Sequence, residues 1–215
     1  MSEDADRIGS RLNALLVEAG MEPLKADLAC RFTEFCLLLT RWNSRINLTA
    51  IRDEEGILSR HFIESIACAR ALPAGIGTLL DFGSGAGFPG IPIALCRPEI
   101  AVTLAESRAK KAAFLQEAVR VVGISANVYS GRAEMLGRQF GCVTLRAVDK
   151  MREAVETGAG LTSPEGWLAL MTTAGELEKL KDTTGPAFTW RSPIMLPGSE
   201  ARLLALAQQT VSLQV

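Results

Sequence analysis

The chain has 215 residues, of which 48% are hydrophobic and 22% are charged, and its formal net charge is −1. This length allows one domain with a substantial core, the composition excludes a largely disordered chain, and the net charge excludes a uniformly basic nucleic-acid binder. The charge is uneven, because residues 97–152 carry ten Lys or Arg against five Asp or Glu, while both ends of the chain are acidic. Such a positive middle segment either attracts a polyanion or forms ordinary solvated surface.

The cysteines and the single histidine give no pattern of a metal site. Five cysteines are scattered along the chain without a CxxC pair, and His61 is the one histidine. Zinc and iron–sulfur sites need clustered soft ligands, so we expect no metal. The odd, scattered cysteine set indicates reduced thiols in a cytoplasmic protein. The acidic N-terminal sequence is not typical of a signal peptide, and no apolar run approaches the about 20 residues of a membrane span, so we expect a soluble protein. No feature of the sequence indicates a subunit interface, so we also expect a monomer.

The first 72 residues predict helices. A first apolar face ends at Gly20, and a longer amphipathic stripe runs from Leu24 to Trp42. The segment NSRINLT interrupts the helical pattern. Asp53 then suits the N-cap of a third helix, which continues to Pro73.

After Pro73, short apolar runs alternate with helical patterns. The runs that predict strands are TLLDF, AVTLAE, ANVYS, CVTLRAV and GWLALMT, with AFTW and ARLLALAQ near the end of the chain, and KKAAFLQEAVRVVG predicts a helix. Strands that alternate with helices indicate a mostly parallel, Rossmann-like sheet covered on both faces. We therefore expect a helical N-terminal cap at residues 1–72 and one α/β domain at residues 73–215.

The segment LLDFGSGAGFPG, residues 79–90, places four glycines directly after the first predicted strand. In α/β sheets ligands bind beyond the carboxyl ends of the strands, where glycine lets them approach the backbone. No Gly-Lys-Ser/Thr follows, which excludes a Walker P-loop, whereas Gly85 to Gly90 matches the GxGxxG of dinucleotide folds. The carboxylate of Asp81 repels a pyrophosphate and suits the ammonium and sulfonium of S-adenosylmethionine. The pattern from Asp81 through Gly83 thus favours a methyl donor, with NAD binding and a plain turn as alternatives.

Two further acidic positions favour an adenosine ligand. Glu106 ends the second predicted strand, where an acid can bind both ribose hydroxyls of NAD or of S-adenosylmethionine. After the third strand, Glu134 or the backbone of Ala133 can meet the adenine amine. Each acid alone is more often solvated surface, but their order along one fold supports an adenosine cofactor.

The chain contains the segments RWNSRINLTAI, RHFIES, LLDFGSGAGFPGIPIAL, ESRAKKAAFL, GRAE and LRAV. Together, from about Trp42 to Val148, they resemble the RsmG family, also called glucose-inhibited division protein B. The resemblance implies a class I S-adenosylmethionine-dependent methyltransferase with a seven-stranded sheet whose last strand is antiparallel. It also implies methylation of N7 of one guanine, nucleotide 527, in 16S rRNA of the small ribosomal subunit.

The resemblance also implies site residues. Cofactor contacts are implied at Gly83, Phe88, Glu106, Ser107, Arg108, Ala133, Glu134 and Arg146, beside Asp81 and Gly85 from the glycine pattern. Two positions depart from the family pattern: Glu64 stands where Asp is usual, and Thr172 stands where Lys is usual. The missing cation at Thr172 raises an alternative, an S-adenosylmethionine-binding protein with another methyl acceptor or without turnover.

Methylation of guanine N7 requires that the base be positioned next to the methyl group, and it requires no acid–base residues. Guanine N7 has an in-plane lone pair and no proton, so it attacks the sulfonium methyl without a general base. We expect Arg146 to position the guanine through O6 or phosphate, with a structural salt bridge as the alternative, and His61 to pack against the NLT turn. The candidate rRNA phosphate contacts are Arg45, Arg52, Arg60, Lys110, Lys111, Arg132 and Arg138.

Overall fold

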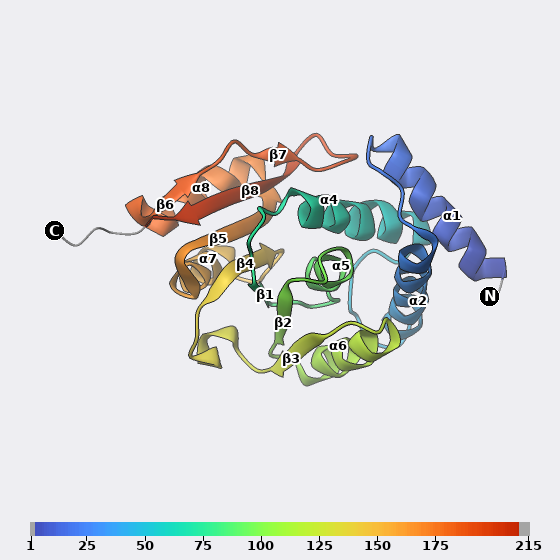
Figure 1. The fold of residues 1–215 in the computed structure, drawn as a ribbon. Helices are drawn as coiled ribbons and strands as arrows, with labels where there is room; N and C mark the ends of the chain where they lie inside the picture. The colour runs from blue at the N-terminus through green and yellow to red at the C-terminus, as the bar shows by residue number, and fades with distance from the viewer. Residues whose placement is uncertain (1–2, 211–215) are drawn as a thin grey trace.

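One twisted sheet runs through the centre of the molecule (Figure 1), seen in a computed structural model that describes residues 3–210. Its strand order is β3-β2-β1-β4-β5-β8-β6, and the two-residue strand β7 pairs with β8 beside this path. The strands are β1 (Thr78–Phe82), β2 (Ala101–Glu106), β3 (Ala126–Ser130), β4 (Phe140–Arg146), β5 (Thr162–Thr173), β6 (Phe188–Trp190), β7 (Ile194–Met195) and β8 (Arg202–Gln209). Strands β1 to β5 are parallel, and the last strand, β8, is antiparallel to β5. The expected seven-stranded, mostly parallel sheet is therefore confirmed, with β7 as an addition.

Helices cover both faces because side chains alternate along each strand. On β1, Leu79 belongs to the buried cluster shared with α4, α5 and α6, whereas Leu80 belongs to the cluster shared with α7 and α8. The helical segments are α1 (Glu3–Glu18), α2 (Ala26–Asn43), α3 (Glu54–Gly56), η1 (Ile57–Ile63), α4 (Glu64–Ala71), α5 (Gly90–Cys96), α6 (Ala109–Val121), η2 (Ala133–Leu136), α7 (Met151–Gly160), α8 (Ala174–Thr184) and η3 (Gly185–Ala187). Among residues 3–210, no helix combines the length and apolar character that crossing a bilayer requires.

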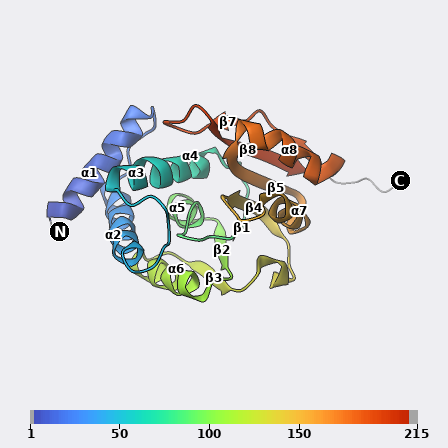
Figure 2. The ribbon, with the colours of Figure 1, turned by 180° about the vertical axis from the view of Figure 1, so that it is seen from behind.

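The N-terminal helices form an outer layer that packs on α5 and α6 (Figure 2). Phe35 of α2 joins the two parts, because its ring centroid lies 5.3 Å from that of Phe62, 5.2 Å from that of Phe88 and 6.3 Å from that of Phe114. These rings come from η1, the glycine loop and α6. The division into a cap and a methyltransferase domain after residue 72 stays a prediction, since both parts share one continuous buried cluster.

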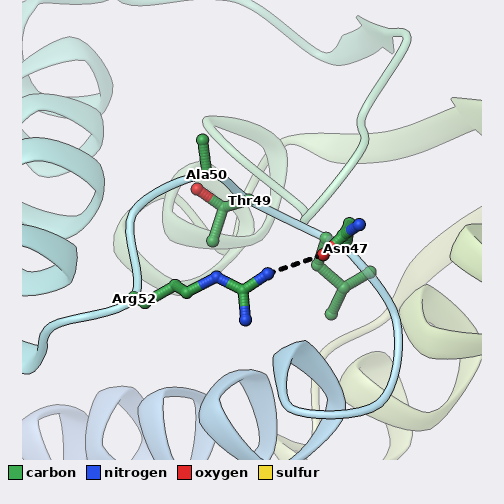
Figure 3. Close-up of a pocket in the computed structure, with 5 residues that line it drawn as sticks. Asn47, Thr49, Ala50 and Arg52 are labelled. Atoms are coloured by element: carbon green, nitrogen blue, oxygen red, sulfur yellow. Dashed lines mark hydrogen bonds between the residues drawn. The ribbon is translucent and has the colours of Figure 1, made fainter.

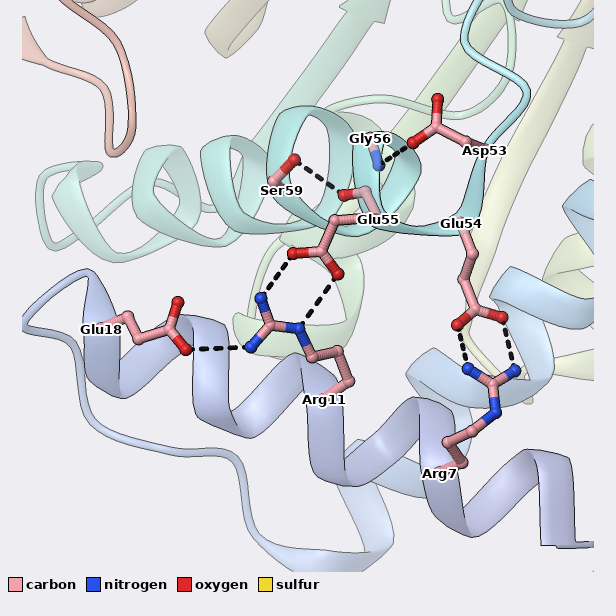
Figure 4. A network of polar contacts seen from close by, with 8 residues as sticks. All are labelled: Arg7, Arg11, Glu18, Asp53, Glu54, Glu55, Gly56 and Ser59. Atoms are coloured by element: carbon pink, nitrogen blue, oxygen red, sulfur yellow. Dashed lines mark hydrogen bonds and ion pairs between the residues drawn. The ribbon is translucent and has the colours of Figure 1, made fainter.

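The third predicted helix is a continuous run of α3, η1 and α4, with a stretch of wider π-helical turns in the middle. Asp53 is its N-cap, as expected, and accepts a hydrogen bond of 2.6 Å from the backbone N–H of Gly56. Two ion pairs, Arg7 with Glu54 and Arg11 with Glu55, tie the start of this run to α1 (Figure 4). These contacts join the start of the run to α1, while His61 and Glu64 lie further along it, in η1 and at the start of α4.

Candidate functional site

A cleft of about 810 Å³ lies beyond the carboxyl ends of β1, β2, β3 and β4. Its floor is the glycine loop after β1, and its outer wall is formed by residues 48–51 together with Arg60 and His61. Nine of the predicted cofactor residues line it: Gly83, Gly85, Phe88, Glu106, Ser107, Arg108, Ala133, Glu134 and Arg146. The structure thus brings together residues from four strand ends, and their individual roles toward a cofactor stay predictions.

The glycine loop has a backbone that other residues would strain. Gly83 and Gly85 have φ of +69° and +56°, in the left-handed region that L side chains rarely adopt. At Gly90, where α5 begins, an added Cβ would lie only 2.6 Å from Oδ2 of Asp81. The loop therefore packs tightly on the end of β1, and its backbone is exposed to the cleft.

Asp81 binds the end of the glycine loop and is not among the residues that line the cleft. Its side chain is buried, with Oδ2 accepting a hydrogen bond from Gly90 N at 3.2 Å and Oδ1 accepting one from Thr144 Oγ1 at 2.9 Å. Burial raises the pKa of this carboxyl to about 6, against the opposing effect of its hydrogen bonds. The contact of Asp81 with the cofactor's ammonium therefore stays a prediction, and in this structure the side chain is turned toward α5 and is not among the residues that line the cleft.

Glu106 joins two of the loops that line the cleft. Its Oε2 accepts a hydrogen bond from Gly85 N at 3.0 Å, and its Oε1 accepts one from Arg108 N at 2.7 Å. A carboxylate offers about four lone pairs, so each oxygen can accept a further hydrogen bond from a ligand. The side chain is 7% exposed and faces the cleft, which fits the predicted contact with a pair of ribose hydroxyls.

Arg146 lies at the edge of the cleft but is held by the helical run. Its Nη2 donates to Glu64 Oε2 at 2.8 Å and to the carbonyl of Arg60 at 2.6 Å, and its Nη1 donates to Ser65 Oγ at 3.1 Å. Glu64 is 1% exposed, and its other oxygen accepts a hydrogen bond of 2.6 Å from Nε of Arg202 on β8. The structural salt bridge is therefore present, and guanine positioning by Arg146 stays a prediction.

His61 links the glycine loop to the outer wall of the cleft. Its ring stacks on Phe88 at 4.9 Å with an interplanar angle of 18°, and its Nε2 lies 2.6 Å from Thr49 Oγ1. The expected packing against the NLT turn is confirmed. Burial, reinforced by the nearby cations Arg146 and Arg60, lowers the pKa of His61 to about 3, so the imidazole is neutral at physiological pH.

We expect His61 to make the protein less stable as the pH falls from 6.5 toward 3. In this window the unfolded chain binds a proton at His61 that the folded protein does not bind, so the free energy of unfolding drops by up to about 1.4 kcal/mol per pH unit. The raised pKa of Asp81 acts in the opposite direction between its usual value of 3.8 and about 6. Comparison with His61→Gln isolates the histidine: the difference in unfolding free energy between wild type and variant should shrink as the pH falls. A difference independent of pH would contradict a neutral buried His61.

The Arg and Lys residues predicted to contact rRNA phosphates lie in different places. Arg60, Lys111 and Arg132 line the cleft, and Arg52 lines a smaller neighbouring cavity. Arg138 instead packs 4.7 Å from the ring centroid of Phe140. Arg45 and Lys110 are exposed outside both cavities. Thr172 lies on β5 opposite Leu203 and is not among the residues that line the cleft.

Two parts of the cleft wall, residues 48–51 and 147–150, were not predicted from the sequence. The second part could have been inferred, because it follows β4 at the same sheet edge as the glycine loop. The first part belongs to a segment that carries the family resemblance, RWNSRINLTAI, but its place in the cleft wall depends on tertiary packing.

The family model described as rRNA small subunit methyltransferase G matches residues 29–190, which include the helical run, the glycine loop and every strand end of the cleft. The chain belongs to this family. A curated member from Roseiflexus sp. (strain RS-1), named ribosomal RNA small subunit methyltransferase G, is 37% identical over 189 residues, which are 82% of this chain and 81% of that protein. The family resemblance seen in the sequence is thus confirmed.

Solved structures show the same fold at low sequence identity. A methyltransferase from Pyrococcus furiosus aligns with a TM-score of 0.62 at 13% identity, covering 84% of this chain and 98% of its own. A SAM dependent methyltransferase from Aquifex aeolicus aligns with a TM-score of 0.57 at 13% identity, covering 72% of this chain and 93% of its own. The class I methyltransferase fold expected for a member of the family is confirmed.

Proposed function

We propose that this protein transfers the methyl group of S-adenosylmethionine to N7 of one guanine in the 16S rRNA of the small ribosomal subunit, at nucleotide 527. The observation that carries this proposal is the match of the rRNA small subunit methyltransferase G model over residues 29–190, which contain all residues of the cleft. The reaction would take place in the bacterial cytoplasm, with the protein acting as a monomer.

The cleft suits an adenosine cofactor with an amino acid tail. Its volume of about 810 Å³ falls within the range of small-molecule sites, and the exposed glycine backbone lets a ligand approach closely. Glu106 would accept hydrogen bonds from the ribose hydroxyls, and Ala133 and Glu134 would meet the adenine. When bound, S-adenosylmethionine supplies an electrophilic methyl group. Because adenosine would occupy the β2 and β3 side, the reacting methyl would lie toward β1 and β4.

The residues of the cleft fit an acceptor that needs no general base. His61 lines the cleft but is held by Phe88 and Thr49. Glu64 lies outside the lining, and its carboxylate is shared between two arginines. A guanine N7 attacks with its own lone pair, so the protein has to orient the base and keep water away. The residues that line the cleft include six Lys or Arg and four carboxylates, which suits an acceptor carried on a polyanion.

The proposal is tested by methyl transfer from labelled S-adenosylmethionine. Small subunits that lack the modification are the substrate, and free 16S rRNA and tRNA run beside them as controls. We expect label in 16S rRNA and none in tRNA, together with cofactor binding that NADH does not displace. Displacement by NADH would favour an oxidoreductase, and tight donor binding without transfer would indicate a protein that binds S-adenosylmethionine without rRNA turnover.

A further inference from the structure

A second cavity of about 440 Å³ opens beside the cleft (Figure 3). It is lined by residues 47–50 and by Arg52, all from the segment between α2 and α3. Leu48, Thr49 and Ala50 line both this cavity and the cleft, so the two spaces meet at this segment. A polymer that places one of its units in the cleft can therefore place an adjoining unit in the second cavity.

The segment is held from behind by side chains of neighbouring elements. Asn43 at the end of α2 accepts hydrogen bonds of 3.0 Å from the backbone N–H groups of Leu48 and Thr49, and its own amide donates to the carbonyl of Ile51 at 3.3 Å. Thr49 is bound in turn to His61. The backbone is thus fixed, and a site built on it needs little reorganisation to bind a ligand.

Two exposed polar side chains face each other in the cavity. Arg52 Nη2 donates to Asn47 Oδ1 at 2.8 Å, which is the dashed contact in Figure 3. Within residues 3–210 no carboxylate forms an ion pair with Arg52, although Arg7, Arg11 and Arg41 all have such partners. A guanidinium has five N–H donors, so four remain available in the cavity.

The chemistry of these side chains selects the ligand. Arginine forks commonly bind guanine through O6 and N7, but N7 of the methylated guanine has to face the methyl group. Arg52 is therefore not suited to that edge of the target base. A phosphate takes the same bidentate contact and is present on each side of the target nucleotide. Asp53, the next residue, has one carboxylate oxygen bound to Gly56 N and caps the helix, and within residues 3–210 it forms no ion pair with Arg52.

We propose that this cavity binds the nucleotide adjoining the methylated guanine, with Arg52 donating to its phosphate and Asn47 holding the guanidinium in place. This inference rests on the proposed rRNA methyltransferase function. The volume of about 440 Å³ fits one nucleotide. The site would bind the RNA strand next to the target base. This role explains why the backbone of the segment between α2 and α3 is fixed by hydrogen bonds beside the cleft.

Steady-state methylation of small subunits tests this site with Arg52→Gln and Asn47→Asp. For Arg52→Gln we expect KM for the subunit to rise about tenfold, an unchanged Kd for S-adenosylmethionine, and a salt dependence of subunit binding that is weaker by about one phosphate contact. Asn47→Asp should raise KM further, because a carboxylate beside Arg52 neutralises the guanidinium and repels phosphate. Arg120→Gln is the matched control, since Arg120 is an exposed arginine in the last turn of α6 that lines neither cavity.

The outcomes separate the two proposals. If wild type methylates subunits and both variants keep its KM and salt dependence, the nucleotide site is wrong and the function stands. If wild type neither binds nor methylates subunits, both proposals fall. Thermal unfolding of each variant, expected to match wild type because both residues are exposed, ensures that a raised KM reports binding.

Discussion

Replacing Glu64 with glutamine is expected to lower the free energy of unfolding by about 3–5 kcal/mol. The Glu64 carboxylate is 1% exposed and accepts hydrogen bonds from Arg146 on β4 and Arg202 on β8. Its replacement leaves two guanidinium groups without their anion, and of these Arg146 is largely buried while Arg202 is partly exposed. Burial already lowers the pKa of Arg146 from its usual value, while Glu64 counteracts this shift. Without Glu64, the unfavourable desolvation free energy of the buried Arg146 guanidinium is no longer offset by a nearby negative charge.

Denaturant unfolding measures this effect, with Glu178→Gln as the control. Glu178 forms an exposed pair with Lys181 on α8, and such pairs contribute about 0.5 kcal/mol or less. We expect the two substitutions to differ by at least about 2 kcal/mol. Equal, small effects would mean that the Glu64 cluster does not hold the helical run against the sheet.

Replacing Glu106 with alanine is expected to weaken S-adenosylmethionine binding roughly 100-fold, since it removes two charge-assisted hydrogen bonds of about 1.5 kcal/mol each. The same change leaves the backbone N–H groups of Gly85 and Arg108 without the carboxylate to which they donate in the unsubstituted protein. Part of the loss would therefore come from a less ordered glycine loop. Calorimetric titration with the donor measures the affinity directly.

A donor analogue without the ribose hydroxyls separates the two contributions of Glu106. Wild type should bind this analogue much more weakly than S-adenosylmethionine, whereas Glu106→Ala should bind both with similar affinity. Strong discrimination that persists in the variant would show that Glu106 does not contact the ribose and acts only by joining the two loops.

The sequence predicts β1, β2 and β3 to the residue, because each is a short apolar run bounded by turn-forming residues. It places the start of β4 two residues late, since Gly141 interrupts the apolar pattern, and the pairing of β4 with β5 is irregular at the same point. The π-helical middle of the third helix has no sequence signal that distinguishes it from an α-helix. Local pattern thus predicts the elements, while their irregularities depend on tertiary contacts.

The same limit applies to the site. The glycine loop, Glu106 and Ala133 could be placed at one sheet edge, because the carboxyl ends of parallel strands lie together. The orientation of Asp81 toward α5 follows from alternation, since it shares its side of β1 with Leu79. The contact between Glu64 and Arg202 joins residues 138 positions apart, and no pattern in the sequence predicts it.

The most direct test of the proposed methyl transfer is to map the methylated base in small subunits treated with this protein and S-adenosylmethionine. Chemical cleavage specific for N7-methylguanine, followed by primer extension along the 16S rRNA, identifies both the nucleotide and the modified atom. We expect cleavage at one guanine, nucleotide 527, and none in subunits incubated without the protein. Label in the RNA without cleavage at a guanine, or cleavage at many guanines, would contradict a transfer directed to one N7.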